Sequence, residues 1–270
     1  MKSNSMKSFL KQFIVTGIML TTLGASLAEA QIQRPRRFSI GVYGGFGADL
    51  NVANFLELPT SPVFSPRTGG TNEPAAFAGA TTIGTWAAGI VMEYQITDQL
   101  NVGLRGAYSV QNSSLLTRST YRVGRSDGTF DDGSSEFSLV SNVQAVALEP
   151  MAGYNLFEGL YVHLGARVNF ATGSSYAQKE TLITPTDGSF SPNSTTRVRN
   201  ERTGALPALN NITVAPLVGV SYNINVIDRL VVSPEAFFSY GIMPFVTDLP
   251  SGSTWTAHSV RVGVSAKYKF

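Results

Sequence analysis

The residues of this chain best suited to chemistry are charged side chains at matching positions of short alternating segments. Glu149 and Arg167 each lie nine residues from Glu158, the centre of a tight turn. A hairpin that pivots on Glu158 places them directly opposite each other, where unlike charges attract. A charge removed from water is tolerated only when it is paired and hydrogen-bonded. Arg105, Glu235 and Arg261 lie at comparable heights in other segments, and Glu93 and Lys267 are further charges on the same face. Together the seven residues predict an ion-pair network.

A catalytic centre has few candidates, because the chain contains two histidines. His163 falls on a polar position within an alternating segment, where it is best interpreted as a polar filler. His258 precedes Ser259, but neighbouring residues of a strand point to opposite faces, so the two make a poor catalytic pair. We therefore expect a protein that is not an enzyme.

Metal and cofactor sites are equally weakly indicated. Asp127, Asp131 and Asp132 could offer oxygen ligands to calcium, but their spacing lacks the full calcium-loop pattern. A turn-forming loop explains them better. The chain has no cysteine, so disulfides and thiol ligands are excluded. We expect no metal and no cofactor.

The elements that must position the charges are strands, since polar and apolar residues alternate with a period of two. One pattern occurs three times, over residues 94–102, 154–162 and 222–230: a strand ending in Tyr, a short polar turn, and a strand beginning with Leu. With a strand from Phe38 and a closing strand over residues 259–270, eight strands result. The segments between the hairpins are long and polar, at residues 49–82, 112–136, 173–210 and, shorter, 244–253. Short turns at one end and long loops at the other are typical of an outer-membrane barrel.

The two faces of the strands differ in the way that a membrane barrel requires. One face carries no charge and has aromatic residues near both ends, as two membrane interfaces would. These are Tyr94, Tyr108, Tyr154, Phe170, Tyr222 and Tyr240. The other face combines charges with many Gly and Ala residues, which suits a crowded interior. A soluble barrel with a solvated charged face is the alternative. The sequence thus predicts an all-β fold, an eight-stranded antiparallel transmembrane β-barrel with short periplasmic turns and long extracellular loops.

Three prolines depart from this pattern. Pro150, Pro216 and Pro234 fall on lipid-facing positions within strands, where each removes a donor from the ladder. We interpret them as bulges or as residues near a membrane interface.

The strand count, the loop asymmetry and a terminal Phe270 after Tyr268 together resemble the OmpA/OmpX-type small outer-membrane β-barrel proteins, the outer membrane protein beta-barrel domain family. The resemblance covers residues 38–270 as architecture. It implies a monomer in the outer membrane of a Gram-negative-type bacterium, in contact with outer-membrane lipid and lipopolysaccharide. It also implies passage through periplasmic chaperones and the outer-membrane barrel assembly machinery, with Tyr268 and Phe270 as the assembly signal.

The N-terminus predicts export. Lys2, Lys7 and Lys11 flank a short apolar run, and small residues follow to Ala30, as in a cleaved signal peptide over residues 1–30. The run is shorter than the ~20 residues of a membrane anchor. A short periplasmic segment, 31–37, then precedes the barrel domain, 38–270. Of 20 basic and 18 acidic residues, three lysines and Glu29 lie in the signal, which leaves 17 of each sign. Such a balance offers no basic face for nucleic acid.

Function is predicted from the lumen and the loops. An eight-stranded barrel is just wide enough for side chains to fill it, so the ion pairs predict a largely plugged lumen. The protein would then serve envelope structure or contact a surface or ligand through its long loops; the alternative is a narrow porin-like channel for ions or small solutes. In the third loop Arg197, Arg199 and Arg202 could contact lipopolysaccharide phosphates, beside Tyr176, although a mixed-charge exposed loop is the simpler interpretation.

Overall fold

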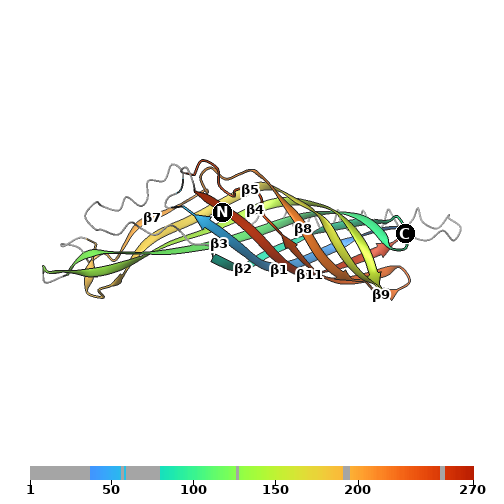
Figure 1. Ribbon diagram of the computed structural model, residues 1–270, viewed down its shortest axis with the longest axis horizontal. Helices are drawn as coiled ribbons and strands as arrows, with labels where there is room; N and C mark the ends of the chain where they lie inside the picture. Colours follow the sequence, from blue (N-terminus) through green and yellow to red (C-terminus); the bar gives the residue numbers. More distant parts are fainter. Residues whose placement is uncertain (1–36, 56–57, 59–79, 126–127, 191–194, 250–252) are drawn as a thin grey trace, which may run out of the picture.

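The computed structural model (Figure 1) describes residues 37–270, except 56–57, 59–79, 126–127, 191–194 and 250–252. The predicted signal peptide and most of the 31–37 segment lie outside the described residues. The strands are β1 (Phe38–Asn54), β2 (Ala80–Gln95), β3 (Leu100–Arg125), β4 (Phe130–Phe157), β5 (Leu160–Thr184), β6 (Gly188–Ser189), β7 (Val198–Gly204), β8 (Ile212–Tyr222), β9 (Ile224–Ile227), β10 (Leu230–Ser239) and β11 (Thr254–Lys269). Within this part of the chain no helix is long and apolar enough to cross a membrane.

Eight strands close into a ring. Their order is β1-β2-β3-β4-β5-β8-β10-β11, and β11 pairs again with β1, always antiparallel. β9 continues β8 past Asn223, while β6 pairs with β3 and β7 with β5 outside the ring. The predicted eight-stranded antiparallel barrel is confirmed. Its final strand is paired on both edges, which explains why alternation persists to the end of the sequence.

The turns at one end of the ring are short because their residues suit tight hairpins. Glu158 and Gly159 have φ angles of 35° and 92°, and positive values at both central positions are those of the two-residue turn that matches strand twist. In the first hairpin the Thr97 hydroxyl accepts hydrogen bonds from the amides of Gln99 and Leu100, at 3.3 and 3.0 Å. Lys269 ends β11 at this same end of the molecule (Figure 1).

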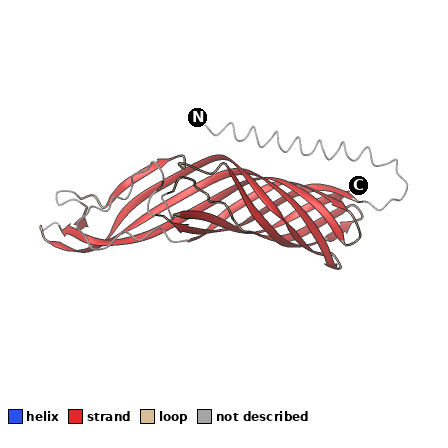
Figure 2. Cartoon of the chain, turned by 45° about the horizontal axis from the view of Figure 1, so that its top comes forward, coloured by secondary structure: helices blue, strands red, loops and turns tan. Residues whose placement is uncertain are grey.

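At the opposite end the structure corrects the sequence interpretation. Where the structure describes them, residues 112–136 and much of 173–210 are paired strand: β3 and β4 stay paired up to Gly124 and Phe130, and β5 extends to Thr184 and pairs with β7. Figure 2 shows strands that continue to this end of the molecule. The extension is rich in Ser and Thr, which hides its apolar positions. Leu115, Phe137 and Leu139 nevertheless keep the inward phase and are buried. Pairing satisfies the backbone there, as sheets require.

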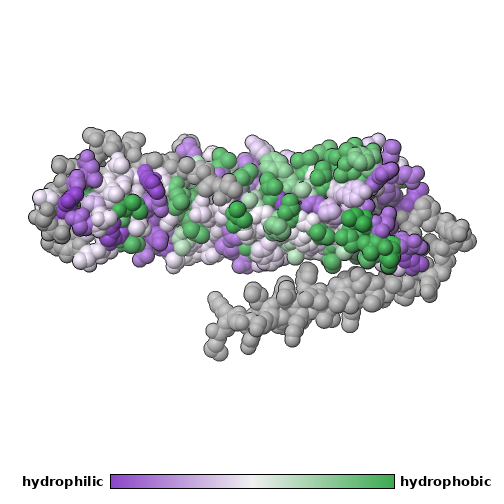
Figure 3. Space-filling view, turned by 90° about the horizontal axis from the view of Figure 1, so that it is seen from below, coloured by the Kyte–Doolittle hydropathy of each residue, from purple (hydrophilic) through white to green (hydrophobic). Residues whose placement is uncertain are grey.

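The outside of the ring is apolar. Side chains on this face are Val42, Phe46, Ile90, Val102, Leu104, Leu148, Leu164, Val218, Val220, Val260, Val262 and Val264, all well exposed. Figure 3 shows hydrophobic side chains gathered on the half of the molecule that ends in the short turns. Between Leu100 and Tyr108 the eight residue steps span about 20 Å along the membrane normal at ~3.4 Å per residue and ~45° tilt. A closed ring with an apolar outside and charges inside is an outer-membrane protein.

The three in-strand prolines are not bulges. β4 keeps its register on β3 through Pro150, Pro216 pairs with Ala166 of β5, and Pro234 pairs with Val264 of β11. Each proline interrupts the ladder on one side only. The Tyr240 amide donates to the Pro216 carbonyl at 2.9 Å, and Pro216 has no N–H to return the bond. Register survives because the other edge of each strand remains fully paired.

Candidate functional site

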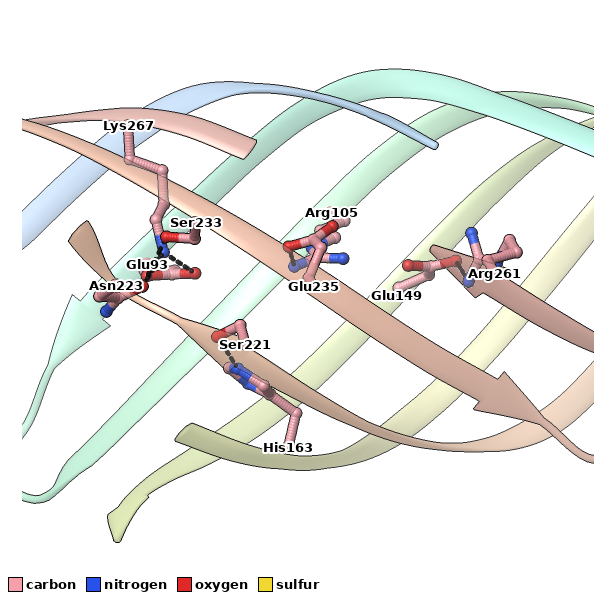
Figure 4. Close-up of polar contacts among 10 residues, drawn as sticks. All are labelled: Glu93, Arg105, Glu149, His163, Ser221, Asn223, Ser233, Glu235, Arg261 and Lys267. Carbon is pink, nitrogen blue, oxygen red and sulfur yellow. Dashed lines mark hydrogen bonds and ion pairs between the residues drawn. The ribbon is translucent and has the colours of Figure 1, made fainter. Parts of the chain in front are cut away.

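The interior of the periplasmic half holds the predicted charges in three layers (Figure 4). The layer nearest the short turns is centred on Lys267 of β11. Its ammonium group lies 2.9 and 2.8 Å from the two carboxylate oxygens of Glu93 and 3.3 Å from Asn223 Oδ1. Ser233 donates to the same amide oxygen at 2.5 Å. The amide therefore ties the ion pair to the barrel wall.

The middle layer pairs Arg105 of β3 with Glu235 of β10, at 2.6 Å between Nη2 and Oε2. The guanidinium carbon also lies 4.4 Å from the ring centre of Phe237 and 5.0 Å from that of Tyr43. Aromatic faces attract cations, more strongly where water is excluded. Arg105 is thus held by one carboxylate and two rings.

The third layer contains Glu149 with two arginines. Arg261 Nη2 lies 2.6 Å from Glu149 Oε1, and Arg167 Nη1 lies 3.7 Å from the same oxygen. Arg167 donates instead to Asn169 Oδ1 at 2.6 Å and to Ser109 Oγ at 2.9 Å. Arg167 was predicted as the partner of Glu149 from the hairpin; it is near, but Arg261 makes the short contact.

The three short ion pairs share one geometric property: each joins strands that are not neighbours in the ring. β2 is linked to β11, β3 to β10, and β4 to β11. Arg105–Glu235 and Arg261–Glu149 join strands on opposite sides of the ring and so cross the lumen, whereas Lys267–Glu93 spans only β1. The narrow bore explains this, because inward side chains of distant strands meet at the axis.

The predicted charges are withdrawn from water. Glu149 is 0 % exposed and Arg167 1 %, and the other five network residues are also buried. Two small cavities among the described residues measure about 40 Å³, beside Glu93 and Lys267 at the periplasmic mouth, and about 10 Å³, beside Arg105. Such volumes hold one to a few water molecules.

Of the two histidines, His163 is buried in the interior beside the charges. His163 Nε2 lies 2.8 Å from Ser221 Oγ. His258, near the opposite end, accepts a hydrogen bond from the Gly241 amide at 3.0 Å and stacks on Tyr240, with ring centres 4.3 Å apart. Within the described part of the chain neither histidine bonds a carboxylate, and no group of three His, Cys, Asp or Glu side chains is placed to hold a metal ion.

The outer half of the interior contains a feature that sequence reasoning missed. An apolar cluster, here called the outer cap, fills the barrel above the charges. Its buried members are Ala53, Phe55, Leu58, Leu115, Phe137, Leu139, Val143, Leu206, Phe245, Val246 and Trp255. Phe55 and Phe245 lie 5.5 and 5.1 Å from the Trp255 ring. The alternation of strand positions could have revealed the cap, since Trp255 lies an even number of residues from Arg261 along β11 and so points to the same inner face.

Between the cap and the ion pairs lies a polar layer that was also missed. Asp49 is fully buried and accepts a hydrogen bond from the Thr85 hydroxyl. Asn51 Oδ1 accepts from Trp255 Nε1 at 3.1 Å and from Ser113 Oγ at 2.8 Å. Through this bond the Trp255 ring belongs to the cap while its N–H belongs to the polar layer.

The three loop arginines differ from one another. The Arg197 guanidinium donates to five backbone carbonyls of residues 182–188. Arg199 pairs with Glu180 at 2.6 Å and lies 4.0 Å from the Phe190 ring centre. Arg197 and Arg199 therefore both have partners within the extension, and the predicted contact of the three arginines with phosphates remains a prediction. Arg202 is exposed.

The predicted interface aromatics and terminal residues occupy the ends of the apolar band. Tyr94, Tyr108, Tyr154, Phe170, Tyr222 and Tyr240 are 37–51 % exposed, on the outside. The Tyr268 hydroxyl accepts from Arg229 at 3.0 Å, and the Phe270 amide donates to the Phe38 carbonyl at 2.9 Å. The chain end is thus locked to the first strand.

No protein-family model and no curated protein matches the chain. Among solved structures it is similar to the attachment invasion locus protein Ail of Yersinia pestis, with 9 % identity, a TM-score of 0.34, and 86 % of this chain and 99 % of Ail covered. It is also similar to the outer membrane protein W of E. coli, with 14 % identity, a TM-score of 0.31, and 88 % of this chain and 100 % of that protein covered. For the outer membrane protease OmpT of Escherichia coli the identity is 10 % and the TM-score 0.33, and 90 % of this chain and 99 % of OmpT are covered.

The architecture is that of a small outer-membrane barrel. The assignment rests on the molecule's own closed ring, apolar belt and buried charges, since the similarities are distant. It agrees with the resemblance to OmpA and OmpX that the sequence indicates.

Proposed function

We propose that this barrel is a closed, non-enzymatic protein of the outer membrane, which serves envelope structure and presents its long extracellular extension for contact. The observation that supports this best is the pairing across the lumen. Ion pairs between non-adjacent strands fill the periplasmic half, and the outer cap fills the half above it. Two chemically different seals in series leave no wide aqueous path along the described interior.

Each seal opposes solute passage by its own mechanism. A permeating ion would have to displace an arginine or a lysine from a buried carboxylate, which leaves an uncompensated charge. It would then have to enter an apolar cluster, where desolvation costs several kcal/mol. A narrow channel for ions or small solutes requires both seals to move together.

The extension supports the contact role. β3, β4 and β5 carry it far beyond the apolar belt, on the side away from the short turns (Figure 1). Outer-membrane lipid and lipopolysaccharide would surround the belt. The assembly machinery and periplasmic chaperones would bind the chain before closure, while Tyr268 and Phe270 are still free of the contacts described above.

Single-channel conductance tests the closed lumen. The mature protein, refolded into a planar bilayer and shown to be folded by its resistance to detergent at room temperature, should produce no reproducible openings. Discrete openings whose size changes in Arg105→Met or Arg261→Met would instead establish the channel. The conductance of the double variant Glu149→Gln/Trp255→Ala is compared with that of the wild type, because this variant weakens both seals at once.

A further inference from the structure

The extension is a sheet with one covered face and one open face. β2 pairs with β3 as far as Val110, and β8 with β5 as far as Phe170, whereas β3, β4 and β5 stay paired well beyond these residues. On the inner face Leu115, Phe137 and Leu139 are buried in the outer cap. On the outer face, which continues the lipid-facing side of the barrel, Val140 and Leu116 are about half exposed.

The open face is uncharged where it leaves the membrane. Above the row Tyr108–Val146–Phe170, which ends the apolar belt, strand register places three successive rows across the sheet. They are Val110–Gln144–Gly173, Asn112–Asn142–Ser175 and Ser114–Val140–Ala177, here called the neutral strip. Charges return in the next two rows, with Lys179 beside Ser138 and then Arg118 beside Glu136. Water-exposed sheet faces ordinarily carry charged residues.

The neutral strip covers the height of the outer leaflet's head-group layer and of the sugar layer directly above it. Two residues at ~3.4 Å per residue and ~45° tilt raise each row by about 5 Å, so three rows cover roughly 15 Å above the aromatic row. A bilayer's polar layer begins there and is about 5–8 Å deep, before any added sugars. The phosphates of a glycolipid would need cationic partners, and the strip has none. Sugars present hydroxyl groups and apolar C–H faces instead.

The polar groups of the strip are already oriented. Asn142 Nδ2 donates to Asn112 Oδ1 at 2.7 Å, and Asn112 Nδ2 donates to the Gly84 carbonyl at 2.9 Å. The Tyr108 hydroxyl donates to Gln144 Oε1 at 2.8 Å. Asn112 uses both ends of its amide in these bonds and so holds Asn142 in place. Because one end of the Asn142 amide and one end of the Gln144 amide are fixed, less side-chain entropy is lost when the other end binds. Val140 and Leu116 are diagonal neighbours and supply a small flat apolar area beside these amides.

We propose that the neutral strip binds the uncharged core sugars of outer-leaflet glycolipid. The inference depends on the outer-membrane placement in the proposed function but not on whether the lumen is closed. It assigns the lipopolysaccharide contact to Asn142 and Gln144, through sugar hydroxyls, and not to the arginines of residues 197–202.

Mixed nanodiscs test the assignment. The refolded protein would be reconstituted with phospholipid and equal amounts of two lipopolysaccharides, one with a complete core and one truncated to lipid A and its innermost acidic sugars. The composition of the isolated discs is then measured by mass spectrometry. We expect the complete-core form to be enriched at least threefold over the truncated form, relative to protein-free discs. In Asn142→Lys/Gln144→Lys the enrichment should fall to the protein-free value, and in the matched control Thr256→Lys, on the opposite wall, it should persist.

The other outcomes overturn the assignment. Equal uptake of both forms by the wild type excludes sugar binding. If the lysine variant takes up more of both forms, the strip faces phosphates. Disulfide dimers of Val140→Cys in intact discs would make the occupant a second copy of the chain. A protein that inserts into discs and remains silent in conductance but shows no enrichment contradicts this inference alone, whereas failure to insert contradicts the proposed function.

Discussion

The two halves of the barrel interior are sealed by opposite chemistry. The periplasmic half contains buried ion pairs, whose desolvation offsets much of their attraction, so they add little net stability while fixing which strands face each other. The outer half contains the outer cap, whose buried apolar area contributes about 25 cal/mol per Å². The polar half is therefore sensitive to the loss of one partner, and the apolar half to the loss of volume. This difference predicts how each half fails.

The largest effect is expected at the centre of the polar half. Glu149→Ala leaves Arg261 and Arg167 buried without a carboxylate, which should lower the free energy of unfolding by about 3–5 kcal/mol. Urea titration in lipid vesicles, followed by circular dichroism, measures it. An unfolding free energy and a conductance both equal to those of the wild type would refute the network.

In the apolar half, Trp255→Ala should lower the free energy of unfolding by about 3 kcal/mol or more, because the fully buried ring leaves a cavity among Phe55 and Phe245. The same titration applies. In the double variant with Glu149→Ala the two losses should add to within about 0.5 kcal/mol, since the two sites share no partner. A larger departure from additivity would show that the two halves of the interior unfold as one energetically coupled unit.

Lys267→Met should cost less than Glu149→Ala, about 1–3 kcal/mol. It leaves Glu93 without its cation, but the cavity of about 40 Å³ at that mouth admits water to the carboxylate. Stability measured at neutral pH gives the comparison. A cost as large as that of Glu149→Ala would mean that water does not reach this layer.

A salt bridge outside the barrel should matter least. Arg118 pairs with Glu136 at 3.1 Å on the extension, but the arginine side chain is 74 % exposed. Glu136→Ala should therefore change the free energy of unfolding by at most about 1 kcal/mol. It is the matched control for Glu149→Ala, since both remove one glutamate from β4.

At the far tip of the extension, the pKa of Asp131 can be measured independently of the stability of the barrel. The hydrogen bond from Arg125 holds the pKa of Asp131 below its usual range, with help from the Asp132 amide. Because the pKa is lowered on folding, any stabilisation is present above the ordinary aspartate pKa and is lost as pH falls through the lowered value. Carboxyl NMR titration should show the pKa rising in Arg125→Ala; an unchanged value would mean that the contact is absent in solution.

The sequence by itself determined the barrel, because period-two alternation, repeated Tyr–turn–Leu hairpins and a charge-free face follow from local rules. It also placed seven charges on the inward face, where the structure buries them, since the parity of a strand position decides inside from outside. It did not reveal that the extension is paired sheet. Its many Ser and Thr residues are typical of loops, and the few apolar residues that alternate with them on the inner face, such as Leu115 and Leu139, are easily overlooked. Only the closed structure decided that Glu149 meets Arg261, that Arg105 meets Glu235, and that Trp255 caps them. Those contacts join strands distant along the ring, and the bore of the barrel, not local spacing, brings them together.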